Sequence, residues 1–226
     1  MKAGKVAFAM LLMSALIFAE PLLLIIDASG SMEDTLDSGV RKIDAAKSAA
    51  TELVNSYSDE IALMVYTDCD SGGDPYSGSI SVWVEFTTDK SELRNQISSL
   101  TPQSDTPIAD SIEEGKTYIE DTKGYGKIVV LTDGEETCGS SSDIGDAIEN
   151  AGIKQIDVSV IGYALDDYTD EELQEIVEDA GGKYYKAGDE EELKQAMKQA
   201  SGDVGCCLFP VALVSLAGYM TYRKFN

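Results

Sequence analysis

Apolar residues are arranged along this chain in two alternating patterns. Short uninterrupted runs, such as LLLII at 22–26 and IVVL at 128–131, are typical of strands buried on both faces of a sheet. Between these runs, segments such as 41–57 repeat apolar residues at the spacing of an amphipathic helix. We expect strands at 22–26, 60–66, 79–86, 127–132, 155–163 and 183–187, and helices at 41–57, 90–100, 107–121, 144–151, 169–180 and 189–200.

This alternation predicts an α/β fold. Strands and helices in repeated succession indicate a Rossmann-like, doubly wound and mostly parallel sheet that is flanked by helices. The segment 79–86 alternates polar and apolar residues, so we expect it to form a half-exposed, antiparallel edge strand of this six-stranded sheet. Thr169 and Glu172 have the spacing of a capping box, which predicts that the helix at 169–180 begins there.

Both ends of the chain are hydrophobic, and we expect a helix in each. Residues 1–19 place Lys2 and Lys5 before an apolar stretch, as in a signal peptide, but Ile17 is not the small residue preferred before a cleavage site, so an uncleaved signal anchor stays open. The uncharged segment 204–222 is long enough for a transmembrane helix. A buried core helix and a sorting signal that is later removed are the alternatives for this segment.

These segments divide the chain into parts. We expect the folded domain at 21–200, a linker at 201–203 and a short tail at 223–226 after the membrane span. The tail contains Arg223 and Lys224, and basic residues next to a span tend to stay in the cytoplasm. The sequence therefore predicts a single-pass protein of the cell membrane with an extracytoplasmic domain and a cytoplasmic C-terminus.

The composition excludes several kinds of chemistry. The chain has no histidine, which rules out Ser-His-Asp catalysis, histidine bases and histidine-ligated zinc. Its four cysteines form no C-x-x-C pair, which argues against a zinc knuckle or a thioredoxin-like centre. A formal net charge of −24 argues against nucleic-acid binding, because phosphates would be repelled. A metal site in this chain must therefore be built from oxygen ligands.

Oxygen-bearing side chains follow the ends of the expected strands. Asp27, Ser29 and Ser31 end and follow the first strand, Asp133 follows a strand that we expect beside it, and Thr106 lies at the start of an expected helix. The carboxyl ends of parallel strands meet at one crevice, where ligands bind. Hard oxygen donors suit a small divalent cation, with Mg²⁺ expected and Mn²⁺ or Ca²⁺ as alternatives. Asp, Ser and Gly are also ordinary turn residues, so an unliganded turn remains the alternative.

Three phrases in this order, DASGSM, SDTPIAD and VVLTDGEET, resemble the three loops of a von Willebrand factor type A (VWA) domain. The resemblance covers about residues 21–200. It implies a metal-ion-dependent adhesion site (MIDAS) that binds a protein partner through a divalent cation, to which the partner presents an Asp or Glu carboxylate. By this resemblance the metal-site positions are Asp27, Ser29, Ser31, Thr106 and Asp133.

Two cysteines fall near the same crevice. Cys69 and Cys138 follow the second and fourth expected strands, which flank the first strand in this sheet order. An extracytoplasmic domain permits a disulfide between them. Two free, buried thiols remain the alternative, because the sequence does not fix the separation of the two Cα atoms.

The function that these features favour is binding without catalysis. We expect a membrane-anchored extracytoplasmic module that binds a protein partner through a cation. A structural subunit of a membrane complex is the alternative. A Mg²⁺-dependent phosphohydrolase of the haloacid dehalogenase type is less favoured, because Ser29 occupies the position of its second catalytic aspartate.

Overall fold

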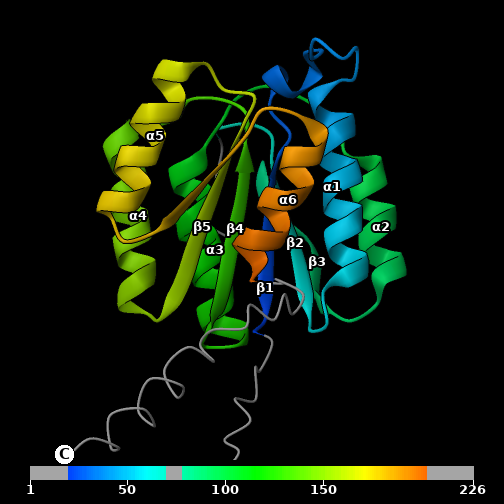
Figure 1. The fold of residues 1–226 in the computed structure, drawn as a ribbon. Helices are drawn as coiled ribbons and strands as arrows, with labels where there is room; N and C mark the ends of the chain where they lie inside the picture. The colour runs from blue at the N-terminus through cyan, green and yellow to red at the C-terminus, as the bar shows by residue number, and fades with distance from the viewer. Residues whose placement is uncertain (1–19, 70–77, 203–226) are drawn as a thin grey trace, which may run out of the picture.

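The computed structural model describes residues 20–69 and 78–202, which form one α/β domain (Figure 1). The expected hydrophobic segments at 1–19 and 204–222 lie outside these residues, as do the tail at 223–226 and the last residue of the linker. None of the helices within the described ranges is long and apolar enough to cross a membrane. The two terminal segments therefore stay predictions.

Six strands form a single sheet in the order β3-β2-β1-β4-β5-β6. All neighbours are parallel except β3, which pairs antiparallel with β2 at one edge. The expected fold class is thus confirmed for the described domain, including the antiparallel edge strand. The strands are β1 (Leu22–Asp27), β2 (Ile61–Tyr66), β3 (Ile80–Thr87), β4 (Gly126–Thr132), β5 (Ile156–Tyr163) and β6 (Lys183–Ala187).

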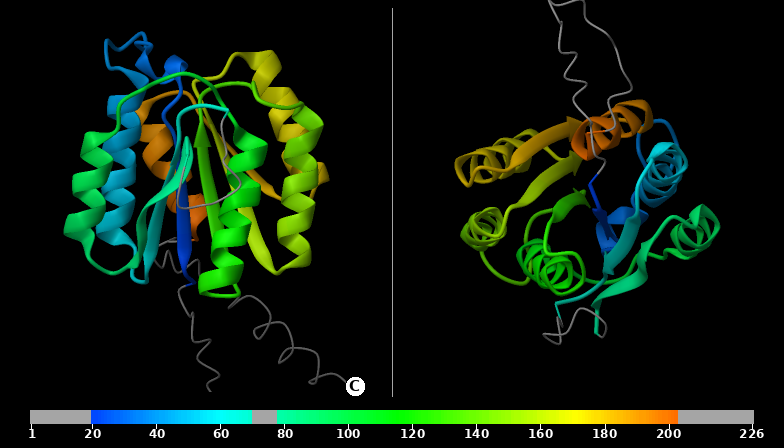
Figure 2. Two further views of the ribbon diagram at one scale, coloured as in Figure 1. Left: turned by 180° about the vertical axis from the view of Figure 1, so that it is seen from behind. Right: turned by 90° about the horizontal axis from the view of Figure 1, so that it is seen from below.

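Helices cover both faces of the sheet, as the view along the strands shows (Figure 2). One core lies under α1, α2 and α6, and the other lies under α3, α4 and α5. Every residue of β1 is buried, because this central strand contributes alternate side chains to the two cores. The helices are α1 (Lys42–Ser56), α2 (Lys90–Ser99), α3 (Ile108–Thr122), α4 (Ser141–Ile153), α5 (Asp167–Asp179) and α6 (Glu190–Ser201), with a short 3₁₀ helix, η1 (Gly30–Glu33), after β1.

Two helices begin earlier than the apolar pattern predicts. The expected capping box of Thr169 and Glu172 is wrong, because Asp166 caps α5 and accepts hydrogen bonds from the backbone N–H groups of Tyr168 and Thr169. Likewise α4 begins at Ser141, where the carboxylate of Asp143 accepts from the backbone N–H of Ser140. Polar cap residues carry no apolar periodicity, so the pattern alone places these starts too late.

Helix α3 packs unusually close to β1. A Cβ atom added to Gly115 would lie 2.9 Å from Leu23 Cδ2 and 3.1 Å from Ile25 Cδ1. The glycine therefore lets the helix lie directly against the central strand. The loop that carries Thr106 leads directly into this helix, which begins at Ile108.

The two ends of the described domain meet at the start of β4. The backbone N–H of Lys127 donates to the carbonyl of Pro21 (3.0 Å), and its Nζ donates to the carbonyl of Ser201 (3.0 Å). This edge of the sheet holds the amino ends of β1 and β4, opposite their carboxyl ends. In Figure 1 both ends of the coloured chain accordingly lie at the bottom.

Candidate metal centre

The centre begins at the carboxyl ends of β1 and β4, which are neighbours in the sheet. Asp27 is fully buried there, and its carboxylate is held on both sides. Oδ1 accepts from the backbone N–H of Ser29 (2.7 Å), while Oδ2 accepts from Thr132 Oγ1 (2.9 Å) and from the backbone N–H of Asp133 (3.4 Å). One carboxylate therefore ties the first loop to the end of β4.

The two serine hydroxyls lie between the two carboxylates. The Oγ atoms of Ser29 and Ser31 are 3.1 Å apart, and Ser31 Oγ donates to Asp133 Oδ1 at 2.6 Å. The turn into η1 brings the hydroxyls to the same side, because Ser29 is extended and Ser31 lies within the 3₁₀ helix.

Thr106 reaches this cluster through the loop between α2 and α3. This loop is bonded to the sheet by Gln103, whose N–H donates to the Ala28 carbonyl (2.8 Å), and by Ser104, whose carbonyl accepts from the N–H of Gly30 (3.2 Å). The contact requires glycine at position 30, since an added Cβ would lie 2.8 Å from the Gln103 carbonyl oxygen. Thr106 itself is buried.

Gly134 shows how close the threonine comes to the first loop. A Cβ added to this glycine would lie 3.6 Å from both Ser31 Oγ and Thr106 Oγ1. The two hydroxyls therefore flank the same point. The structure thus brings all five sequence-predicted side chains to one crevice, from three separate loops, while their role as metal ligands stays a prediction.

The electrostatics of the crevice favour an added positive charge. Burial, and after it the nearby charge of Asp133, raise the pKa of Asp27 to about 6. Beside this carboxylate, on the neighbouring strand β2, burial together with the charge of Asp27 raises the pKa of the Tyr66 hydroxyl. A cation would stabilise the ionised carboxylates.

The donor set fits a hard divalent cation. Two carboxylates and three hydroxyls are all oxygen donors, the kind that Mg²⁺ prefers. Asp27, Ser29, Ser31, Thr106 and Asp133 are the residues that would hold such an ion. An ion there would act as a Lewis acid toward an incoming anionic oxygen.

Lys42 already supplies one positive charge to this centre. Its Nζ donates to Asp133 Oδ2 at 2.7 Å, with Asp133 fully buried and the lysine side chain 13% exposed. Both oxygens of Asp133 are therefore engaged, one by Ser31 and one by Lys42. Nothing in the sequence points to Lys42, since it belongs to the polar start of a helix, far from Asp133 in the chain.

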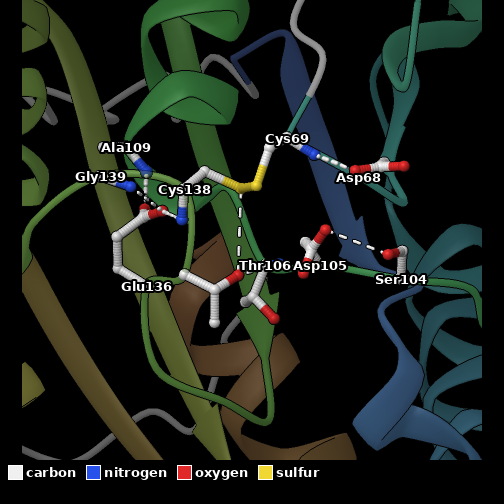
Figure 3. Close-up of a disulfide and its surroundings, with 10 residues drawn as sticks. Asp68, Cys69, Ser104, Asp105, Thr106, Ala109, Glu136, Cys138 and Gly139 are labelled. Carbon is white, nitrogen blue, oxygen red and sulfur yellow. Dashed lines mark hydrogen bonds between the residues drawn. A yellow bond between two sulfur atoms is a disulfide. The ribbon is translucent and has the colours of Figure 1, made fainter.

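Glu136 and Thr137, which follow Asp133 in the third loop, hold the second loop in place. Thr137 Oγ1 accepts from the backbone N–H of Thr106 (2.7 Å), and the N–H of Thr137 donates to the Thr106 carbonyl (3.1 Å). The carboxylate of Glu136 accepts from the N–H of Ala109 at the start of α3 and from the N–H groups of Cys138 and Gly139 (Figure 3). Polar residues in a loop have no periodic signal that predicts such contacts.

A disulfide closes the rim of the crevice. Cys69 and Cys138 are bonded, with their Cα atoms 5.2 Å apart, so the expected pairing is present (Figure 3). Within the described residues, Asp68 and Asp105 also bring their carboxylates within 4.8 Å of each other and of the Cys69 sulfur. Because that sulfur is in the disulfide, it is not available as a thiolate ligand.

Known proteins resemble this chain in sequence. The family model described as "von Willebrand factor type A domain" matches residues 22–199. YwmC of Bacillus subtilis (strain 168), an uncharacterized protein, is 29% identical over 189 residues, which cover 78% of this chain and 81% of YwmC.

Solved structures share the fold at low sequence identity. The PilB minor pilin from Streptococcus sanguinis has a TM-score of 0.63 at 14% identity, over 82% of this chain but only 61% of the pilin chain. The vWF domain of the type V pili tip protein Mfa5 from Porphyromonas gingivalis has a TM-score of 0.65 at 12% identity, over 81% of this chain and 94% of that domain. With a family model that matches well over half of its length, the chain belongs to the von Willebrand factor type A domain family.

Proposed function

We propose that this protein is a membrane-anchored, extracytoplasmic binding module without catalytic activity. It holds a divalent cation, Mg²⁺ in the first instance, and through this cation binds a protein partner that presents an Asp or Glu carboxylate. The residues that bind the metal are Asp27, Ser29, Ser31, Thr106 and Asp133. The cation and these residues constitute a MIDAS.

One observation carries the proposal: oxygen atoms from three loops converge on one crevice. Ser31 Oγ is hydrogen-bonded to Asp133, and a Cβ added to Gly134 would lie 3.6 Å from both Ser31 Oγ and Thr106 Oγ1. These residues are far apart in the sequence, so ordinary turn chemistry within a single loop does not account for their meeting.

The donor set also indicates what the cation would bind. The two carboxylates together with the bonded Lys42 ammonium carry one net negative charge, so a divalent cation keeps an uncompensated positive charge. A carboxylate is the side chain that best neutralises this charge. The chain offers no histidine base, and serine occupies position 29, where a phosphohydrolase of the haloacid dehalogenase type needs its second aspartate.

The domain geometry agrees with membrane anchoring at the opposite end. Pro21 and Ser201 both bond to Lys127 at the amino edge of the sheet. The segments expected as signal and membrane span would therefore leave the domain on the side away from the crevice. The pilus proteins with the same fold, a minor pilin and a pili tip protein, support a role in surface assemblies.

Metal titration of the full chain in detergent tests the metal site. We expect Mg²⁺ and Mn²⁺ to bind with one ion per chain by calorimetry, and the variants Asp27→Asn and Asp133→Asn to weaken binding by about tenfold or more, because each removes a charge next to the cation. Asp121→Asn is the matched control, since Asp121 is exposed at the far end of α3. Absence of binding of Mg²⁺, Mn²⁺ and Ca²⁺ to the unaltered chain would refute the proposal.

Partner binding is tested from solubilised membranes in the presence of Mg²⁺. We expect a protein that is retained by the unaltered chain, released by EDTA and not retained by Asp133→Asn. A partner that stays bound after chelation and with both aspartate variants would instead favour a structural subunit of a membrane complex.

A further inference from the structure

The buried ion pair of Lys42 and Asp133 places a second cation in the candidate metal centre. Lys42 Nζ and Asp133 Oδ2 are 2.7 Å apart, and only 13% of the lysine side chain is exposed. Such a pair is seldom retained for stability alone, because removing two charges from water offsets much of their attraction. Its position on a proposed metal ligand suggests a role in binding.

The fold holds Lys42 in register with the metal-binding loop. The N–H of Lys42 donates to the carbonyl of Asp34 (2.9 Å), and a β-bridge joins Thr35 to Arg41. The Arg41 guanidinium in turn bonds to Glu33 at the end of η1 and to Asp44 in α1. These bonds join the two ends of the segment between Ser31 and α1. The Lys42 ammonium is therefore directed at Asp133 by the same turn that positions the serines.

The ammonium alters the charge balance of the site. Asp27 and Asp133 together with Lys42 carry one net negative charge. A divalent cation would overcompensate this charge and leave the loaded centre positive, which opposes binding of the cation alone. A carboxylate from a partner would restore neutrality.

We propose that Lys42 is a built-in counter-ion that lowers the affinity of the centre for a divalent cation alone and makes cation and carboxylate bind cooperatively. This inference rests on the proposed metal site. Lys42 is a positioning residue that tunes the metal affinity, because it acts through Asp133 and is not itself a ligand of the metal. The metal then binds the partner carboxylate, and the carboxylate in turn is needed for tight binding of the metal.

Calorimetric titration with Mn²⁺, with and without acetate as the carboxylate probe, tests the proposal on the full chain. Lys42→Met removes the charge and keeps the length of the side chain. Lys47→Met, also in α1 but outside the metal centre, is the matched control for loss of one positive charge. Lys42→Arg keeps the charge and serves as the conservative variant.

We expect two effects of opposite sign in Lys42→Met. Its affinity for Mn²⁺ without acetate rises about tenfold or more, since a unit charge next to a carboxylate shifts its ionic equilibria by at least that factor. The factor by which acetate tightens Mn²⁺ binding falls, and by linkage the loaded site also binds acetate less well. Lys42→Arg and Lys47→Met keep the weak affinity and the strong acetate effect of the unaltered chain.

Thermal unfolding covers the case in which Lys42→Met folds poorly, because the substitution leaves Asp133 buried without its partner. Saturating Mn²⁺ should then raise the melting temperature of Lys42→Met more than that of the unaltered chain. If Mn²⁺ binds the unaltered chain and Lys42→Met matches Lys47→Met in both affinity and acetate effect, the counter-ion is refuted while the metal site stands. If neither the unaltered chain nor any variant binds Mn²⁺, the counter-ion proposal fails, and the metal site fails with it when Mg²⁺ and Ca²⁺ do not bind either.

Discussion

Thr106 and Thr137 illustrate how single residues build the crevice. Thr106 is predicted from the sequence as a ligand, whereas the contacts that support its backbone are not. The side chain and N–H of Thr137 supply that support through two hydrogen bonds to the Thr106 backbone. A residue that positions a ligand in this way is invisible in the sequence, because it needs only a hydroxyl at the right place in space.

Replacing Thr137 by valine tests whether Thr137 positions Thr106 for metal binding. Thr137→Val removes the acceptor for the Thr106 N–H, and we expect the free energy of unfolding to fall by about 1 kcal/mol. Metal affinity should fall several-fold as Thr106 loosens. Thr137→Ser retains the hydroxyl and should restore both values. Equal metal affinity in all three proteins, measured by calorimetry beside urea unfolding, would show that Thr137 does not position the ligand.

The strand order and the disulfide both bring loops of the fold together at the crevice. The strand order places β1 between β2 and β4, so the loops that follow these three strands share one edge of the sheet. The disulfide of Cys69 and Cys138 then joins the loops after β2 and β4 across a sequence separation of 69 residues. A cross-link over such a long loop restricts the unfolded chain strongly.

The double variant Cys69→Ser/Cys138→Ser should lower the free energy of unfolding by about 2–4 kcal/mol. We expect a smaller loss of metal affinity than in Thr137→Val, since hydrogen bonds of Glu136 and Thr137 still hold the second loop. Urea unfolding with and without dithiothreitol is the measurement, and the double variant should be insensitive to the reductant. A reductant effect of equal size in the variant would mean that the disulfide is not its source.

At the scale of the whole described domain, residues 20–69 and 78–202, the two domain ends lie apart from the candidate site. The crevice lies at the carboxyl edge of the sheet, whereas Pro21 and Ser201 meet beside Lys127 at the amino edge. With a net charge of −24, the protein also attracts cations over its whole surface, an effect that salt screens.

Ending the chain after Gly202 should therefore release it from the membrane without changing its metal affinity. The reason is that the expected span is removed while every proposed ligand stays in place, far from the cut. Membrane fractionation and Mn²⁺ titration are the two measurements. A truncated chain that stays in the membrane would show that residues 1–19 are a retained anchor, and one that loses metal affinity would contradict the separation of the two ends.

Much of this architecture is determined locally. Apolar runs and helical periodicity predict the strands and helices because burial on two faces, or on one face of a helix, dictates which residues must be apolar. The polar residues after β1 and β4 likewise follow from the order of the chain, and parallel strands bring their ends together. For that reason Asp27 and Asp133 could be placed at one crevice before the fold was known.

The supports of the site were decided by tertiary structure, whereas the helix starts depend on local caps that the apolar pattern does not show. The caps Asp166 and Ser140 start α5 and α4 earlier than expected, because such caps depend on single hydrogen bonds that leave no periodic pattern. Lys42, Glu136 and Thr137 reach their partners only after distant segments have packed. The sequence by itself determined which oxygen atoms this protein could offer a cation. The packing of three loops determined how these atoms are held and that Lys42 bonds to Asp133. The reason is that contacts between residues far apart in the chain are set by the complete fold.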